Sequence, residues 1–123
     1  MSKMNEYVEA EQPPENYKPY PGDFTKIYVN GNLYPRHVVC AANRFDHNGE
    51  KLVICGARHW DEIMCKVVDA LGIDDRKDHE QGFIDQYQNF ITRKEACIIA
   101  LTNKQPLRDE LRPNDIAFSE NFY

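Results

Sequence analysis

The stretch that most constrains the fold of this chain is 37–61, where two short apolar segments flank the dipeptide Asn48-Gly49. Asn-Gly supplies the two positive-φ positions of a two-residue type I′ turn, so the stretch predicts a β-hairpin. In that register the facing pairs are Arg44–Val53, Ala42–Cys55, Cys40–Ala57 and Val38–His59. Apolar side chains fall on both faces, which is typical of strands covered on both sides by a helix, a sheet or a second subunit.

The 123-residue length predicts one domain over residues 23–123, preceded by an arm over residues 1–22. We expect the arm to be extended or disordered, because its prolines cannot donate to a sheet and bias the preceding residues toward extended backbone. These prolines are Pro13, Pro14, Pro19 and Pro21. After the arm, residues 24–29 read as a strand, and Asn30-Gly31 predicts a first small hairpin that returns over residues 32–34.

A helix is predicted directly after the central hairpin, with Asp61 as its cap and Gly72 as its stop. Apolar residues recur there at spacings of three and four: Ile63, Met64, Val67, Val68 and Leu71. We interpret the positions of Met64 and Cys65 as core packing in preference to a cofactor-binding face. The polar run over residues 74–80 predicts a solvated loop.

The second informative stretch is 80–104. Residues 82–85 read as a strand, 86–89 as a turn and 90–91 as the returning strand. Thr92 and Glu95 form a capping-box pattern, which predicts a second helix whose first turn, beside Arg93, is suited to an anion. The predicted fold class is therefore α+β, a small antiparallel sheet built on the central hairpin with two packed helices.

The C-terminal segment carries Arg108 and Arg112 four residues apart. A helical turn over residues 106–111 would place both guanidinium groups on one face, where they could bind a ligand. The alternative is a surface charge ladder with Asp109 and Glu110. We expect the aromatic end of the segment to dock on the core or on a partner.

Charge and composition exclude several function classes. The net charge of −5 argues against a binder of long nucleic acids, since the chain has no basic stripe that would release counterions. The sequence contains no apolar run of membrane-spanning length. The four cysteines lack C-x-x-C spacing, and we expect buried free thiols of a cytoplasmic protein and no metal site. They are Cys40, Cys55, Cys65 and Cys97.

An enzymatic function is not favoured. His59 with Asp61, next to Arg58, could form an acid–base pair, but such a pair is common by chance. The sequence shows no G-x-S-x-G, H-E-x-x-H or glycine-rich phosphate loop. We therefore predict that the protein is not an enzyme and has no catalytic residues and no cofactor.

A binding function accounts better for the arginine and aromatic side chains of this sequence. Guanidinium groups are planar forks suited to phosphate, and aromatic rings stack on nucleobases. The arginines in question are Arg58, Arg93, Arg108 and Arg112, and the aromatics are Trp60, Phe83 and Phe90. In an acidic protein this combination indicates a small nucleotide in a pocket, although Phe83 and Phe90 are also typical core residues.

Four sequence blocks together resemble a known family: C-x-A-x-R-F, I-C-G-A-R-H-W-D, E-Q-G-F-I-D-Q-Y-Q-N-F-I-T-R-K-E-A and the closing F-S-E-N-F-Y. Over residues 38–123 the chain is similar to small phage and prophage proteins, and most resembles the type-one Thoeris anti-defence proteins. The resemblance implies a sponge that captures a cyclic ADP-ribose-type immune signal without cleaving it. It also implies hexamers, a second site for cyclic oligonucleotides, and action in the cytoplasm of the infected bacterium.

The resemblance also implies roles for individual residues. Phe83 would stack on adenine, beside the cap formed by Thr92 and Arg93. Arg108 and Arg112 would clamp the diphosphate, and Arg58 would face phosphates, including those of the second site. The ligand-binding set that we expect is Arg58, His59, Phe83, Phe90, Thr92, Arg93, Arg108 and Arg112. One departure is Gln88, which stands where a glycine is expected in the Q-x-x-N turn.

Two alternative functions remain open from the sequence. One is an inhibitor that binds a host enzyme through a protein surface. The other is a hydrolase that degrades the nucleotide signal, for which His59 and Asp61 would be the first candidates.

Overall fold

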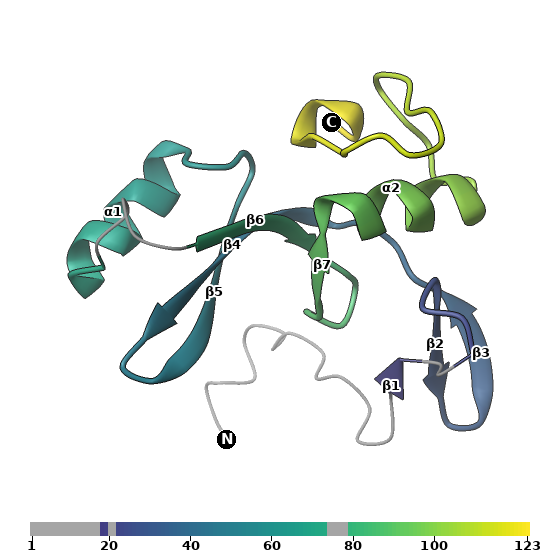
Figure 1. The fold of residues 1–123 in the computed structure, drawn as a ribbon, viewed down its shortest axis with the longest axis horizontal. Helices are drawn as coiled ribbons and strands as arrows, with labels where there is room; N and C mark the ends of the chain where they lie inside the picture. Colours follow the sequence, from purple (N-terminus) through teal and green to yellow (C-terminus); the bar gives the residue numbers. More distant parts are fainter. Residues whose placement is uncertain (1–17, 20–21, 74–78) are drawn as a thin grey trace, which may run out of the picture.

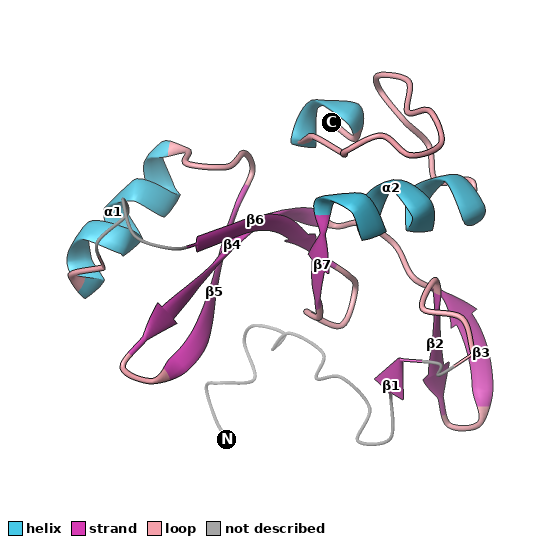
Figure 2. Cartoon of the chain, viewed as in Figure 1, coloured by secondary structure: helices cyan, strands magenta, loops and turns pink. Residues whose placement is uncertain are grey.

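The protein folds into two antiparallel sheets and two helices, as seen in this computed structural model, which describes residues 18–19, 22–73 and 79–123 (Figure 1). The strands are β1 (Lys18–Pro19), β2 (Lys26–Val29), β3 (Asn32–Pro35), β4 (Cys40–His47), β5 (Glu50–Gly56), β6 (His79–Ile84) and β7 (Phe90–Thr92). The helices are α1 (Glu62–Leu71), α2 (Arg93–Thr102) and the 3-10 turn η2 (Ser119–Asn121) (Figure 2). The predicted α+β class is confirmed.

The central hairpin β4–β5 forms as predicted. Asn48 and Gly49 have φ values of 52° and 82°, and the register pairs Arg44 with Val53 and Ala42 with Cys55. The predicted continuation of this ladder is wrong, since pairing ends at Gly56 and the pairs Cys40–Ala57 and Val38–His59 do not form. The reason is local, because the Asp61 carboxylate accepts the amides of Ala57 at 2.8 Å and Arg58 at 3.3 Å and turns the chain out of the sheet.

The main sheet has the strand order β5-β4-β6-β7, so β4 is flanked on both sides. Ala41 and Phe45 project from the same face of β4, because side chains alternate along a strand. Ala41 lies in a buried cluster with Phe83 and residues of α2, and Phe45 lies in a second cluster with Met64 of α1. Both helices therefore cover one face of the sheet, and we call the opposite face, which carries Cys40, Val53, Cys55 and Ile84, the helix-free face.

Both helices begin where the sequence predicts, but α1 packs less completely than expected. Asp61 caps α1 through the Met64 amide, and Gly72 ends it with φ of 68°. Met64 and Val68 are buried, whereas the row Ile63, Val67 and Leu71 is exposed. The interpretation of Met64 as a core residue is confirmed, and Cys65 is half-buried. The five apolar residues span two adjacent sides of the helix, and the sheet covers only one of them.

The N-terminal region forms a separate three-stranded sheet. Asn30 and Gly31, with φ of 51° and 83°, make the predicted turn between β2 and β3. Lys18 and Pro19 pair with Tyr28 and Ile27 as β1, so this part of the predicted arm is a strand. Residues 1–17 and 20–21 lie outside the described residues.

The predicted loop over residues 74–80 is wrong at its end. His79 and Glu80 belong to β6 and pair with Phe45 and Arg44 of β4. Residues 74–78 lie outside the described residues. The polar side chain of Glu80 fits in the strand because it reaches the guanidinium group of Arg44 at 2.8 Å.

A buried ion pair that the sequence did not reveal joins the two sheets. Arg36 Nε lies 2.9 Å from Asp85 Oδ2, and both side chains are buried. Arg36 also donates to the carbonyl oxygen of Phe24 at 2.8 Å. Asp85 accepts in addition from the amides of Tyr87 and Asn89, so the same carboxylate holds the turn between β6 and β7.

Replacing Asp85 by Ala should lower the free energy of unfolding by about 3–5 kcal/mol, because Arg36 would remain buried without its counter-charge. Urea unfolding at neutral pH measures this loss. Glu80→Ala is the matched control, since the Arg44–Glu80 pair is partly exposed and should contribute less than about 1 kcal/mol. Equal losses in the two variants would contradict the assigned role of the buried pair.

Candidate anion-binding site

Arg58 leaves the end of β5 and reaches the C-terminal segment. Its Nη2 donates to the main-chain oxygen of Tyr123, and its guanidinium carbon lies 4.9 Å from the centre of the Tyr123 ring. Its Nη1 is buried, and none of the described residues accepts a hydrogen bond from it. Arg58 is therefore held in place, and one of its buried donors has no acceptor among the described residues.

Arg93, the first residue of α2, repeats this arrangement from the other side. Its Nη2 donates to Gln81 Oε1 at 2.5 Å, and its guanidinium carbon lies 4.9 Å from the Phe118 ring centre. Its Nε is buried and has no acceptor among the described residues. Burial lowers the pKa of Arg93, and the Glu120 carboxylate opposes that shift.

His59 and Phe83 lie beneath these arginines. Nε2 of His59 is 2.7 Å from the carbonyl oxygen of Gly82, which requires the proton on that nitrogen. The His59 ring meets Phe83 edge-on at 5.3 Å, and Phe122 contacts Phe83 at 5.2 Å. Phe83 is 0% exposed, so within one chain it offers no ring face to a nucleobase.

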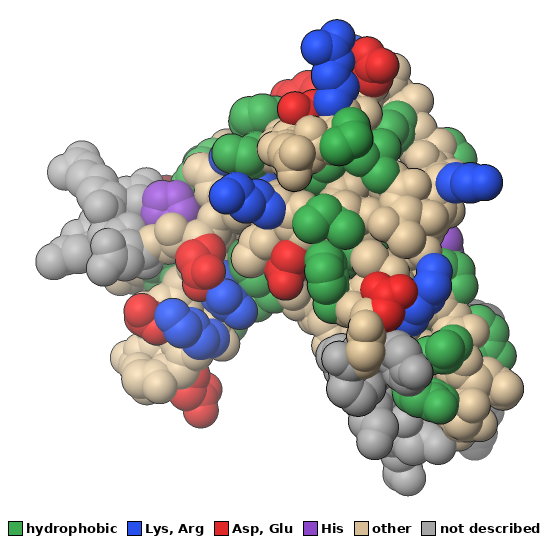
Figure 3. Space-filling view, turned by 45° about the vertical axis from the view of Figure 1, so that its right-hand side comes forward, with side chains coloured by type: hydrophobic (Ala, Val, Ile, Leu, Met, Phe, Trp, Pro, Cys, Tyr) green, Lys and Arg blue, Asp and Glu red, His purple; other side chains and the backbone are tan. Residues whose placement is uncertain are grey.

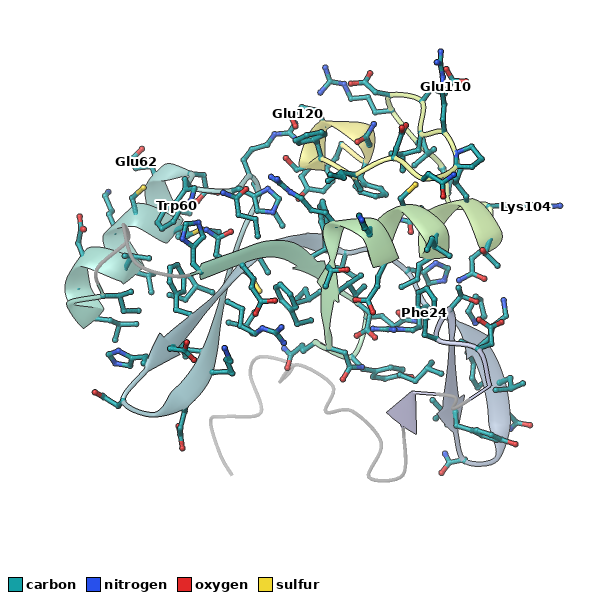
Figure 4. All side chains as sticks on the ribbon, in the orientation of Figure 1. Phe24, Trp60, Glu62, Lys104, Glu110 and Glu120 are labelled. Carbon is teal, nitrogen blue, oxygen red and sulfur yellow. The ribbon has the colours of Figure 1, made fainter. Side chains whose placement is uncertain are left out.

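The C-terminal segment brings two further charged residues, Arg108 and Glu120, close to Arg58. The amide of Arg108 donates to the carbonyl oxygen of Asn121 at 2.8 Å, and Arg108 Nη1 lies 3.4 Å from the main-chain oxygen of Tyr123. The pKa of Glu120 is lowered first by its own backbone amide and then by Arg58 and Arg108. Figure 4 shows Glu120 on the C-terminal turn, on the same side of the sheet as the loop that carries Trp60. We call Arg58, His59, Arg93 and Arg108 the arginine cluster.

Two of the expected ligand residues, Arg112 and Phe90, make their contacts away from the arginine cluster. The side chain of Arg112 is 77% exposed, and its Nε lies 3.8 Å from Glu110 Oε1. The predicted helical turn over residues 106–111 is wrong, because the amides of Arg108 and Asp109 donate to Asn121 and not to the preceding turn. Phe90 belongs to the helix-free face, where the Arg44 guanidinium lies 4.2 Å from its ring centre.

Thr92 positions Arg93 through the capping box, which is confirmed. Its hydroxyl accepts the Glu95 amide at 3.1 Å, and Glu95 Oε1 accepts the Thr92 amide at 2.9 Å. In the adjoining turn, Gln88 adopts the positive φ of 67° at the place where a glycine was expected. The loop thus keeps a glycine-like backbone without a glycine.

The possible acid–base pair of His59 and Asp61 does not form. His59 is bonded to Gly82, and the oxygens of Asp61 accept the amides of Ala57, Arg58 and Met64. The Met64 amide is the largest cause of the lowered pKa of Asp61. This carboxylate acts as a cap for α1.

The sequence did not single out Gln81, Glu120 or Tyr123, which complete the surroundings of the arginines. The closing F-S-E-N-F-Y block was the available signal, since it carries two of them. On the face in Figure 3, positive and negative side chains lie next to one another, which differs from a basic stripe. Over residues 18–19, 22–73 and 79–123, no group of three or more metal-ligating side chains comes together, and no helix is long and apolar enough to cross a bilayer.

Comparison with known protein families matches residues 37–123, a range that includes the whole arginine cluster and the main sheet. The chain belongs to the Phage T4 y16D protein family. This family assignment confirms the prediction of a phage protein. Comparisons with curated proteins and with solved structures find no match.

The position of His59 makes the stability of this family member depend on pH. Burial lowers the pKa of His59, while the bond to Gly82 opposes the shift. The unfolded chain therefore takes up a proton near pH 6.5 that the folded chain resists, and stability should fall as the pH drops below about 6.5. Urea midpoints measured from neutral to mildly acidic pH should show this loss in the wild type and a smaller loss in His59→Gln. An identical slope in the two proteins would contradict it.

Proposed function

We propose that this phage protein binds a cyclic ADP-ribose-type immune signal and holds it intact, so that the signal cannot reach its effector. The arginine cluster is the proposed binding site for the phosphates. The observation that carries this proposal is the pair of buried guanidinium donors, Arg58 Nη1 and Arg93 Nε, for which the described residues provide no acceptor. A buried donor left without a partner costs about 1–3 kcal/mol, and more when it is charged.

A diphosphate suits this site for chemical reasons. Its oxygens accept hydrogen bonds from several planar forks at once, and such charge-assisted bonds are stronger than neutral ones. Arg58 and Arg93 approach from the sheet and α2, and Arg108 approaches from the C-terminal segment. The nearby Glu120 carboxylate is a negative charge that a bound phosphate would have to face or displace.

Sequestration without cleavage is supported by the hydrogen bonds of His59 and Asp61, the two residues that could have formed an acid–base pair. His59 donates to a carbonyl oxygen and Asp61 caps a helix, so neither is placed to activate water. We propose that the protein acts as a sponge, whose function depends on tight binding and not on turnover.

The nucleobase end of the ligand is assigned to a site shared between subunits. Phe83, which the resemblance implies as the adenine platform, is covered in the single chain by His59 and Phe122. Phe118 is exposed beside Arg93 and offers an alternative ring. Arg112 would join the ligand only from a neighbouring subunit. We therefore propose a homo-oligomer, with the hexamer implied by the resemblance, a second site for cyclic oligonucleotides, and action in the host cytoplasm.

The decisive experiment is capture and release. The purified protein is mixed with a cyclic ADP-ribose made by a bacterial TIR enzyme, free ligand is removed, and the protein is denatured by heat. Chromatography of the released material should return the intact cyclic nucleotide in near-stoichiometric amount. Altered product would favour the hydrolase, and no retained ligand would contradict the sponge.

Replacing Arg108 by Ala should weaken capture about tenfold to a hundredfold, because a hydrogen bond to a charged group contributes about 1.5–3 kcal/mol. Arg108 is exposed, so the variant should unfold at the wild-type urea concentration. Lys104→Ala is the matched control, since Lys104 projects from the far end of α2 (Figure 4). Equilibrium dialysis measures both affinities, and equal affinities would contradict the assignment. Arg112→Ala should also weaken capture if subunits share the site.

A second candidate function is favoured by a different observation. The exposed row Ile63, Val67 and Leu71 on α1 is spaced like the anchor residues of a helix that docks on a partner protein. A host enzyme bound through this row would make the protein an inhibitor. A stoichiometric complex that forms without nucleotide and is lost in Val67→Glu would favour this function over the sponge.

A further inference from the structure

The helix-free face brings two cysteines together. Cys55 faces Ala42 across the β4–β5 ladder, and Cys40 lies two residues before Ala42 on the same strand. Residues directly opposite share a face, as do residues two apart on one strand, so both thiols project from the same side of the sheet. The expectation that the cysteines are buried thiols is wrong for Cys55, which is exposed, and Cys40 is only half-buried.

The thiol of Cys55 opens into a hollow of about 280 Å³ lined by Val53, Cys55, Ile84 and Gln88. Ile84 faces Cys40 across the β4–β6 ladder, so a wall residue of this hollow lies next to Cys40. Among the described residues that line it, Val53 and Ile84 are aliphatic. The space is large enough to hold a small substituent attached to the Cys55 sulfur.

The two neighbouring thiols change each other's pKa. A hydrogen bond from Cys40 is the main cause that lowers the pKa of Cys55 to about 7, and the same bond raises the pKa of Cys40. The remaining cysteines are used differently, since Cys65 Sγ donates to the Trp60 carbonyl at 3.5 Å and Cys97 Sγ donates to the Arg112 carbonyl at 3.3 Å. A thiol that donates to a carbonyl must keep its proton, whereas a sulfur that accepts a hydrogen bond is favoured as the thiolate.

We propose that Cys55 is a nucleophilic modification site that undergoes thiol–disulfide exchange with low-molecular-weight disulfides, with Cys40 as its positioning residue. The Cys55 thiolate attacks one sulfur of a disulfide R–S–S–R. One Cys55–S bond forms, the S–S bond of the reagent breaks, and R–S⁻ leaves with the electron pair. No further oxidant is needed, because the reagent disulfide is itself reduced, and the attached group R occupies the hollow beside Val53 and Ile84.

The test uses the full chain and the reagent dithiodipyridine, whose departing thiopyridone is measured by its absorbance. The wild type should show one fast phase of one equivalent, which peptide mass mapping assigns to Cys55. Its rate should reach half of its maximum near the pKa of about 7. A lower pKa increases the fraction of thiolate but decreases the nucleophilicity of that thiolate. At neutral pH the fast phase should therefore be only roughly threefold faster than the reaction of an ordinary thiol. The pH dependence of the rate is a sharper test than the rate itself.

Four variants make the outcome decisive. Cys55→Ser should lose the fast phase, and Cys65→Ser, the matched control, should keep it. Cys40→Ala should move the half-maximal rate toward about pH 8.5, the value of a free thiol, while Cys40→Ser should keep it near the wild-type pH because its hydroxyl still donates. A fast phase that survives in Cys55→Ser, or a profile that does not move in Cys40→Ala, would overturn the proposal.

Discussion

The contact on which the candidate site depends is the packing around Phe83. This fully buried ring lies where three parts of the chain meet: β6, the loop that follows β5, and the C-terminal segment. His59 meets its edge from the loop, and Phe122 meets it from the C-terminal segment. Arg58 is the neighbour of His59 in sequence, and η2 lies next to Phe122. Burial of this aromatic ring, with its large apolar area, therefore helps to bring separate arginines together.

Electrostatics explains why such a cluster can exist in an acidic protein. The guanidinium groups of Arg58 and Arg93 are stabilised by the faces of Tyr123 and Phe118 and by one hydrogen bond each, and so they are ordered without being neutralised. Glu120 supplies the nearest negative charge but is exposed, where solvent screens its attraction. The cluster thus keeps two buried guanidinium donors without an acceptor among the described residues, and these donors are the basis of the proposed anion site.

The elements with strong local signals were predictable, and the long-range contacts were not. Asn48-Gly49 determined both the turn and the register of the central hairpin, and Asp61 and Thr92 marked the starts of the helices. The arrangement of the site depends on contacts without local signals, such as the docking of Arg108 on Asn121, more than ten residues away. That contact replaced the helical turn expected over residues 106–111. The exposure of Cys55 was missed for a related reason, since an apolar run does not reveal which face of a sheet a helix covers.

The sheet separates two kinds of chemistry. Ala41, Phe83 and Ile91 project toward α2 and the C-terminal segment, and the arginine cluster is assembled above them. Cys40, Cys55 and Ile84 project to the other side, because neighbouring side chains on a strand point to opposite faces. The alternation along β4, β5 and β6 thus places the arginine cluster and the two thiols on opposite sides of the sheet. Since stacked layers lie about 10 Å apart, side chains on one face do not touch ligands on the other. Any coupling between the two sites would have to pass through the backbone of β4 and β6 or through a second subunit.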